Sequence, residues 1–148
     1  MIRSFLHLYW RFTRGMTLGV RGAVLDAGGK VLLVRHGYIP GWHFPGGGVE
    51  PGESLTQSLA RELEEEGNIR LTGTPLLHGV FQNAGASRRD HVAVFVVRDF
   101  DWPGPPPPSW EIPEADFFPL DRLPEGTSDS TRRRLEEILY GAPVSAIW

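Results

Sequence analysis

One segment, residues 44–69, constrains this chain more than any other, because it joins a glycine-rich loop to a helix with many glutamates. The helix is predicted over residues 54–66, since Ser54 is a favourable N-cap and Gln57, three residues later, completes a capping box. The loop contains the run Gly46–Gly48, which lets the backbone approach a ligand closely and adopt positive φ angles. The segment therefore predicts a helix preceded by a backbone that a ligand can reach.

Three glutamates of this helix share one face, because residues three or four positions apart are neighbours on a helix. They are Glu62, Glu65 and Glu66, and they border a leucine stripe formed by Leu55, Leu59 and Leu63. Carboxylates beside an apolar edge face a cleft, where mutual repulsion and burial both disfavour their charged forms. A hard divalent cation such as Mg²⁺ relieves this conflict, since it prefers oxygen ligands and substrate phosphates. For the glutamate run by itself, a solvated helix face is the alternative.

The spacing of loop and helix residues resembles the Nudix box, a motif written G-x5-E-x7-R-E-U-x-E-E-x-G-U in which U is aliphatic. Its fixed positions correspond here to Gly47, Glu53, Arg61, Glu62, Leu63, Glu65, Glu66 and Ile69. The one departure is Asn68, which replaces the last glycine. That glycine belongs where a helix ends in the left-handed conformation, and asparagine tolerates this conformation best among the other residues.

The resemblance to the Nudix hydrolases implies an α/β fold, an α/β/α sandwich around a mixed β-sheet. It implies hydrolysis of the diphosphate linkage that joins a nucleoside diphosphate to another group, with Mg²⁺ or Mn²⁺ as cofactor. Phosphoryl chemistry depends mostly on positioning and charge neutralisation, which agrees with the acidic helix face. By motif position, the implied metal ligands are Glu62, Glu65, Glu66 and the carbonyl of Gly46, and the implied supporting residues are Glu53 and Arg61.

Residues outside the motif are expected to complete the site. Glu111 stands six residues before Phe117, where the family usually has a loop glutamate, and it would bind metal or act as base. A plain surface charge is the alternative for Glu111. Side chains expected to bind the substrate are the aromatic residues Tyr38, Trp42 and Phe81, which would stack on a base, and the basic residues Arg35, Arg88, Arg89 and His91, which would meet phosphates. Ordinary packing is the alternative for the aromatic rings.

The competing function is a catalytically idle Nudix domain that binds nucleotides or regulates a partner. Idle members lose glutamates of the motif, whereas all four are present here, and this favours the hydrolase. A pyrophosphohydrolase of RNA 5′ ends is a narrower option. The net charge of −3 counts against it, because nucleic-acid binders are usually basic. We therefore expect a small nucleotide-type substrate and no nucleic-acid partner.

The 148 residues fit one domain, and the lack of cysteine excludes disulfides, cysteine-ligated metals and thiol catalysis. This composition is compatible with a cytoplasmic location, which we expect. No apolar run reaches the roughly 20 residues of a membrane span.

Residues 1–15 form an amphipathic segment, which we expect to pack on the domain or on a second subunit, leaving a homodimer open. The alternative is a basic helix lying on a membrane surface.

The remaining pattern predicts an alternation of strands and helices. Apolar, β-branched runs predict strands over 17–26, 30–36, 69–82, 91–100 and 115–120. Ala27–Gly29 predicts a hairpin turn between the first two strands, and the Gly- and Pro-rich residues 37–53 predict a loop. The proline-rich residues 103–110 predict an extended surface loop. A closing helix is predicted over 131–140, capped by Ser130 or Asp129.

Overall fold

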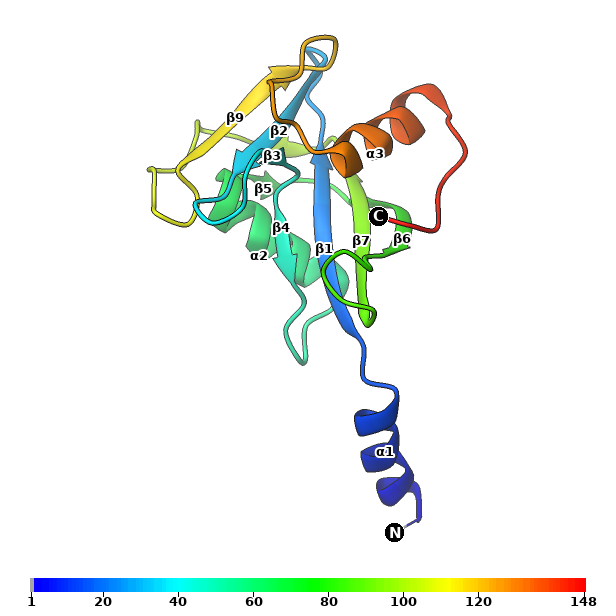
Figure 1. Ribbon diagram of the computed structural model, residues 1–148. Helices are drawn as coiled ribbons and strands as arrows, with labels where there is room; N and C mark the ends of the chain where they lie inside the picture. The colour runs from blue at the N-terminus through cyan, green and yellow to red at the C-terminus, as the bar shows by residue number, and fades with distance from the viewer. Residues whose placement is uncertain (1) are drawn as a thin grey trace.

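The computed structural model describes residues 2–148, and Figure 1 shows its elements in chain order. Within this range there are three helices and nine strands, several of them very short. They are α1 (Ile2–Thr13), β1 (Thr17–Val24), β2 (Lys30–Arg35), β3 (Trp42–His43), β4 (Gly46–Gly48), α2 (Leu55–Gly67), β5 (Arg70–Leu71), β6 (Leu76–Gln82), β7 (Asp90–Val97), β8 (Phe100–Asp101), β9 (Glu114–Pro119) and α3 (Asp129–Tyr140).

The strands form a mixed sheet of order β4-β1-β7-β6, an antiparallel sheet of order β3-β2-β9, and the small pair β5-β8. In the larger sheet β1 runs parallel to β7 and antiparallel to β4. The register pairs Arg21 with Gly46 and Val20 with Gly47. This pairing brings the glycine run, which leads into α2, against the middle of β1.

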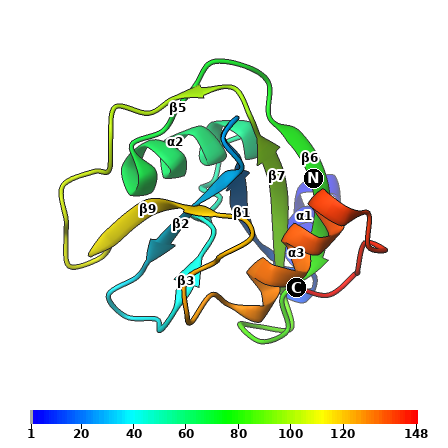
Figure 2. The ribbon, with the colours of Figure 1, turned by 90° about the horizontal axis from the view of Figure 1, so that it is seen from above.

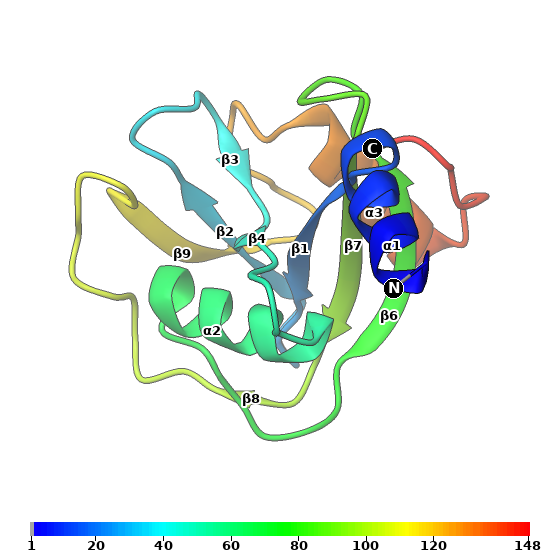
Figure 3. The ribbon, with the colours of Figure 1, turned by 90° about the horizontal axis from the view of Figure 1, so that it is seen from below.

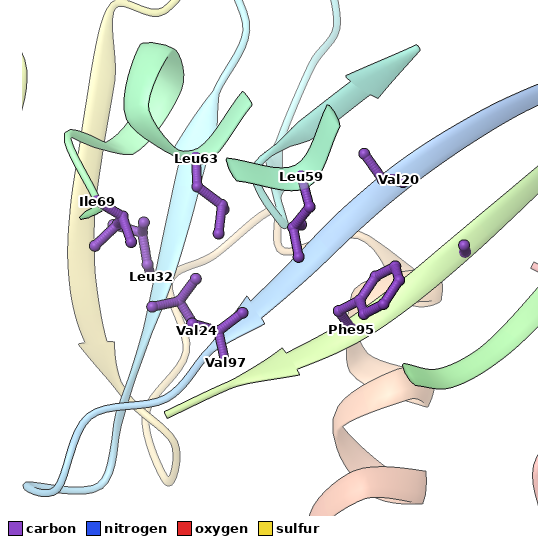
Figure 4. Close-up of a cluster of buried hydrophobic side chains, with 9 residues drawn as sticks. Val20, Val24, Leu32, Leu59, Leu63, Ile69, Phe95 and Val97 are labelled. Atoms are coloured by element: carbon purple, nitrogen blue, oxygen red, sulfur yellow. The ribbon is translucent and has the colours of Figure 1, made fainter. Parts of the chain in front are cut away.

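The core has two layers because successive side chains of a strand point to opposite faces. On one face, Val20 and Val24 of β1 pack with Leu59 and Leu63 of α2, as Figure 4 shows. On the other face, Ala23 packs in a cluster with Leu135 of α3. Figure 2 shows α2 and α3 on opposite sides of the strands. The predicted α/β/α sandwich around a mixed sheet is therefore confirmed, and burial of both sheet faces explains why β1 and β2 are mostly apolar.

The hairpin turn predicted at Ala27–Gly29 is present, but the two strands that it joins do not pair along their length. The carboxylate of Asp26 accepts N–H bonds from Gly28 and Lys30, and Gly29 has a positive φ of 78°. Beyond the turn, β1 and β2 share one isolated bridge, between Leu25 and Val31. Both edges of β1 are occupied by β4 and β7, so β2 must pair with β3 and β9 instead.

Three other boundaries differ from the prediction. The residues 37–53, predicted as loop, contain β3 and β4. The strand predicted over 69–82 is split into β5 and β6, with Pro75, which has no N–H to donate, between them. The closing helix begins earlier than predicted: Ser128, not Ser130 or Asp129, is its N-cap, since its Oγ accepts the N–H of Thr131. The extended loop is confirmed, since residues 103–110 contain neither helix nor strand.

The N-terminal helix α1 stands apart from the sandwich (Figure 1). None of its residues is buried, so the expectation that it packs on its own domain is wrong. Packing on a second subunit is not tested by a single chain. Across residues 2–148, no helix has both the length and the apolar character needed to cross a membrane.

The helix α2 ends as the sequence predicts. Ser54 and Gln57 form the reciprocal capping box, and Asn68 closes the helix in the left-handed conformation, with φ 57° and ψ 33°. The Asn68 side chain adds a bond of its own, because its Nδ2 donates to the carbonyl of Gly104 over 3.0 Å. The substitution of asparagine for the glycine of the motif is therefore accommodated by backbone conformation and by one side-chain contact.

We expect Asn68→Val to lower the free energy of unfolding by about 2–3 kcal/mol, since the left-handed conformation costs about 1–2 kcal/mol and the bond to Gly104 about 1 kcal/mol. Asn68→Gly loses the bond but gains conformational freedom, so we expect a change within about 1 kcal/mol. Urea denaturation of the three proteins measures both differences. Equal stability of the valine and glycine variants would contradict this explanation.

A buried ion pair holds α3 and the C-terminal residues to β6. Arg134 is fully buried, its Nη2 donates to Glu137 Oε2 over 3.0 Å, and its Nη1 donates to the carbonyl of Ile147 over 2.9 Å. Its guanidinium carbon lies 4.1 Å from the centroid of the Phe81 ring. Burial raises the pKa of Glu137, but hydrogen bonds from His78, the Ser145 amide and Arg134 outweigh it and bring the pKa below its usual value.

Removing one member of such a pair leaves a buried charge without compensation. We therefore expect Arg134→Met to lower the free energy of unfolding by about 3 kcal/mol. The matched control is Arg122→Met, at an exposed arginine, which we expect to change stability by less than about 0.5 kcal/mol. Chemical denaturation of both variants measures the effect, and similar small changes would show that the buried pair contributes little.

Candidate active site

Helix α2, which carries the glutamates, lies beside the glycine strand β4, as the view from below shows (Figure 3). Glu66 is only 7% exposed, and its Oε2 accepts the N–H of Gly46 over 2.9 Å. Burial raises the pKa of this carboxyl to about 7, and the bond from Gly46 offsets only part of that rise. A carboxylate in this position lacks a full counter-charge, so the approach of a cation would stabilise its ionised form.

Arg61 joins the other glutamates of the motif into one network. Its Nε and Nη2 donate to the two carboxylate oxygens of Glu53 over 3.0 and 2.9 Å, and its Nη1 donates to Glu62 Oε1 over 2.7 Å. A further bond of 3.3 Å runs from Nη2 to the carbonyl of Gly48. Burial raises the pKa of Glu62, whereas the bonds from Arg61 and from the Glu50 amide lower that of Glu53. Arg61 and Glu53 thus fix the glycine strand to the helix.

Glycine is required at two positions of this strand by close approach. A Cβ at Gly47 would lie 2.6 Å from the carboxylate of Glu62. A Cβ at Gly46, where φ is 150°, would collide with the carbonyl of Val20 on β1. The glycines therefore let β4 lie between β1 and the carboxylates of α2 with no side chain in the way.

A cleft of about 410 Å³ opens in front of these groups. Its walls carry the carboxylates of Glu62, Glu66 and Glu111 beside the backbone of Gly46–Gly48. Tyr38 and His36 line it as well, and so do Thr17, Asn83 and Asp90 at the start of β1 and around the β6–β7 connection. Three carboxylates from two separate segments, α2 and the loop before β9, therefore line one polar cavity.

The loop that carries Glu111 is anchored by contacts of this residue and its neighbours. The carbonyl of Glu111 accepts the N–H of Gly37 over 2.9 Å, and Ile112 is buried with Val34 and Ala115. The Oγ of Ser109 accepts the N–H of Ile112 over 3.0 Å. These contacts hold Glu111 over the cleft at the end of the proline-rich loop.

Two residues of the cleft were missed by sequence reasoning. Arg21 donates from Nη1 to the carbonyls of Phe44 and Gly46, over 3.1 and 3.2 Å. His36 is buried with its Nδ1 4.0 Å from Glu66 Oε1, and among the described residues neither ring nitrogen has a hydrogen-bond partner. Burial, followed by the charges of Arg21 and His43, lowers the pKa of His36 to about 4. The sequence did contain a signal for both residues, since each is a basic residue within or directly after an otherwise apolar strand.

The oxygen atoms that line the cleft fit a divalent cation, although they do not form a complete set of metal ligands by themselves. Across residues 2–148, no three acidic or histidine side chains form a cluster that could hold a metal unaided. Glu65 is 61% exposed and lies 3.6 Å from Arg61 Nη1, and the carbonyl of Gly46 already accepts a bond from Arg21. Mg²⁺ commonly binds one or two carboxylates and completes its shell with waters and substrate phosphates. Buried Glu66, with Glu62 one turn earlier on α2 and Glu111 from the loop before β9, supplies oxygen ligands of this kind.

Most of the residues predicted to bind substrate lie outside this cleft. Tyr38 lines it. Phe81 is fully buried beneath Arg134, so its predicted stacking on a base is wrong. Arg35 pairs with Glu114 over 3.2 Å and lies above the ring of Trp42, which packs on Phe118. Residues Arg88 and Arg89 line a separate hollow near Thr13 and Met16, and His91 does not line the main cleft.

A family model described as the NUDIX domain matches residues 15–138. Diphosphoinositol polyphosphate phosphohydrolase 2 from Rattus norvegicus is 40% identical over 76 residues, which are 49% of this chain and 42% of that protein. RNA pyrophosphohydrolase from Coxiella burnetii is 43% identical over 54 residues, which are 36% of this chain and 24% of that protein. The crystal structure of a MutT NUDIX hydrolase from Burkholderia pseudomallei has a TM-score of 0.70 at 27% identity, covering 82% of this chain and 97% of that one.

The protein is an α/β/α sandwich with a polar cavity. Glutamates and glycines line this cavity, which lies where a short strand leads into a helix. Since the family model matches well over half of its length, the chain belongs to the NUDIX domain family. The chain spans less than half the length of these two curated relatives.

Proposed function

We propose that this chain is a divalent-metal-dependent hydrolase that cleaves the diphosphate linkage of a nucleoside diphosphate derivative. The observation that carries the proposal is that Glu62, Glu66 and Glu111 line one cleft together with the glycines of β4. Three carboxylates around a cavity repel a diphosphate unless cations stand between them, so the site is suited to a substrate that arrives with metal.

The carboxylates of Glu66 and Glu62 would hold the metal, together with Glu65 and the Gly46 carbonyl. A bound Mg²⁺ or Mn²⁺ supplies charge neutralisation for the diphosphate and lowers the pKa of a water ligand. Arg61 and Glu53 keep the glycine strand and Glu62 in place, because their bonds join the helix to the loop. Glu111 faces the same cavity and takes a proton from the attacking water. Tyr38, which is 60% exposed and lines the cleft, would stack on the nucleobase.

The names of the relatives support cleavage between two phosphates, but they do not single out one substrate. Besides the two relatives above, a protein named putative 8-oxo-dGTP diphosphatase from Bacillus subtilis is 42% identical over 50 residues, 34% of each chain. These names share attack on a phosphate–phosphate bond and differ in the group attached to it. The proposal therefore extends to the diphosphate linkage and to a nucleotide-type substrate, without choosing the attached group.

The test is a panel of nucleoside triphosphates, dinucleotides and nucleotide sugars, incubated with the full chain and scored by product mass. We expect at least one compound to be cleaved within its phosphate chain when Mg²⁺ or Mn²⁺ is present, and no cleavage after chelation with EDTA. Turnover unaffected by EDTA would contradict metal dependence. Tight nucleotide binding without turnover in either metal would instead support the idle, ligand-binding domain.

A further inference from the structure

The helix α1 has two faces of opposite character. At 3.6 residues per turn, its polar side chains and the adjoining Arg14 lie within an arc of about 100°. They are Arg3, Ser4, His7, Arg11 and Arg14. The other arc, of about 200°, is entirely apolar or aromatic except for Thr13 near its middle. Arg14 continues the helical turn, since its N–H donates to the carbonyl of Trp10 over 2.7 Å.

This wide apolar face is exposed. Ile2, Phe5 and Phe12 have 72–79% of their surface in contact with solvent, and Leu8 and Tyr9 more than half. Exposed apolar residues scattered singly are ordinary, but a contiguous face of large side chains marks a site of interaction. Burying a side chain of this size is worth about 1.5–3 kcal/mol, so the face has a strong tendency to be covered.

The charge around this helix indicates what covers it. Residues 2–25 contain no acidic residue, while Arg3, Arg11 and Arg14 all lie on the helix or directly after it. Arg88 and Arg89 line a hollow with Thr13 and Met16 at the base of the helix, and Arg89 Nη1 donates to the carbonyl of Gly15 over 2.7 Å. These five arginines contribute five positive charges to a chain of net charge −3, so the rest of the protein carries −8. Five of the fifteen basic side chains therefore lie at one end of an acidic protein.

We propose that α1 docks this protein on a membrane surface that carries anionic lipid headgroups. The apolar face lies in the boundary between headgroups and acyl chains, while the arginines of the polar face and of the β6–β7 connection contact lipid phosphates. A second copy of the helix fits less well, because two helices without acidic residues repel each other and offer no complementary charge. Only three residues, 14–16, separate α1 from Thr17, which lines the catalytic cleft. Docking therefore holds one end of that cleft beside the membrane surface.

The test is sedimentation of the purified full chain with vesicles of phosphatidylcholine, with or without phosphatidylglycerol. We expect binding at least about 100-fold stronger when phosphatidylglycerol is present, and weaker binding at high salt. Arg3→Gln with Arg11→Gln is expected to weaken it about 30-fold, because each basic side chain near an anionic surface contributes about fivefold. Phe5→Ser with Phe12→Ser is expected to weaken it at least about 100-fold.

Matched controls distinguish docking through α1 from nonspecific charge attraction and from nonspecific hydrophobic adsorption. The pair Arg98→Gln and Arg122→Gln removes two exposed arginines elsewhere, and Tyr140→Ser removes an aromatic side chain that is 70% exposed on α3. We expect both controls to bind vesicles like the unmodified chain. Circular dichroism of each variant, compared with the unmodified chain, checks that it is folded.

Two results would overturn the proposal. One is binding to phosphatidylglycerol vesicles that falls equally in the α1 variants and in the controls. The other is a chain that does not bind these vesicles but forms a dimer in analytical ultracentrifugation, with the dimer lost in Phe5→Ser with Phe12→Ser. Neither readout involves hydrolysis, so the outcome is independent of the proposed activity.

Discussion

Replacement of Glu66 by glutamine is expected to lower kcat about 10³-fold at saturating Mg²⁺ while the protein remains folded. Glu66 is the most buried of the motif glutamates, and its raised pKa shows that burial already disfavours its charge. Glutamine keeps an oxygen that accepts the N–H of Gly46, and it removes the charge that a cation would neutralise. Loss of metal-based charge stabilisation is worth several kcal/mol in the transition state. Steady-state kinetics with a thermal unfolding scan measure the two effects separately.

The same helix supplies the controls for this experiment. Glu64→Gln changes an exposed glutamate at the free position of the motif, and we expect kcat within about twofold of the unmodified chain. Glu65→Gln tests the more exposed ligand and is expected to lower kcat at least about 100-fold. A Glu66→Gln protein that kept nearly full activity at saturating Mg²⁺ would show that Glu66 does not hold the metal.

Replacement of Glu111 by glutamine is expected to lower kcat by about 10²–10⁴-fold, the usual contribution of proton transfer by a positioned side chain. Glu111 faces the cleft, and its loop is held by Ile112 and by the bond from Gly37, so glutamine should occupy the same place. The acidic limb of the pH profile of kcat should flatten, because that limb reports deprotonation of the base. The measurement is a pH series of kcat for both proteins.

Glu114→Gln is the matched control, since Glu114 lies three residues further along the same chain segment, at the first residue of β9. Its carboxylate pairs with Arg35 at the surface and does not line the main cleft. We expect Glu114→Gln to change kcat by less than about twofold, because exposed ion pairs contribute little. Small and equal effects from both substitutions would show that Glu111 is only a surface charge and that the base lies within the motif.

Local features of this protein were predictable from the sequence. The capping box of Ser54 and Gln57, the left-handed Asn68 and the shared face of Glu62 and Glu66 all depend on neighbours within about four residues. The apolar, β-branched runs that predicted β1 and β2 were visible as well, and the layered α/β class followed from the resemblance that the motif carries. For such features the sequence itself contains both interacting partners at a fixed spacing.

Contacts between distant segments were decided by the tertiary structure. The sequence placed β2 beside β1, but β7 and β4 occupy both edges of β1, and each edge can hold only one partner. Phe81 is aromatic and follows an exposed strand residue, yet Arg134 from α3 covers it. Likewise, the amphipathic pattern of α1 predicts packing on the domain or on a second subunit, and within the single chain none of its residues is buried. Spacing along the chain specifies which side chains share a face, whereas the partner of that face depends on which other surfaces the folded chain has left unpaired.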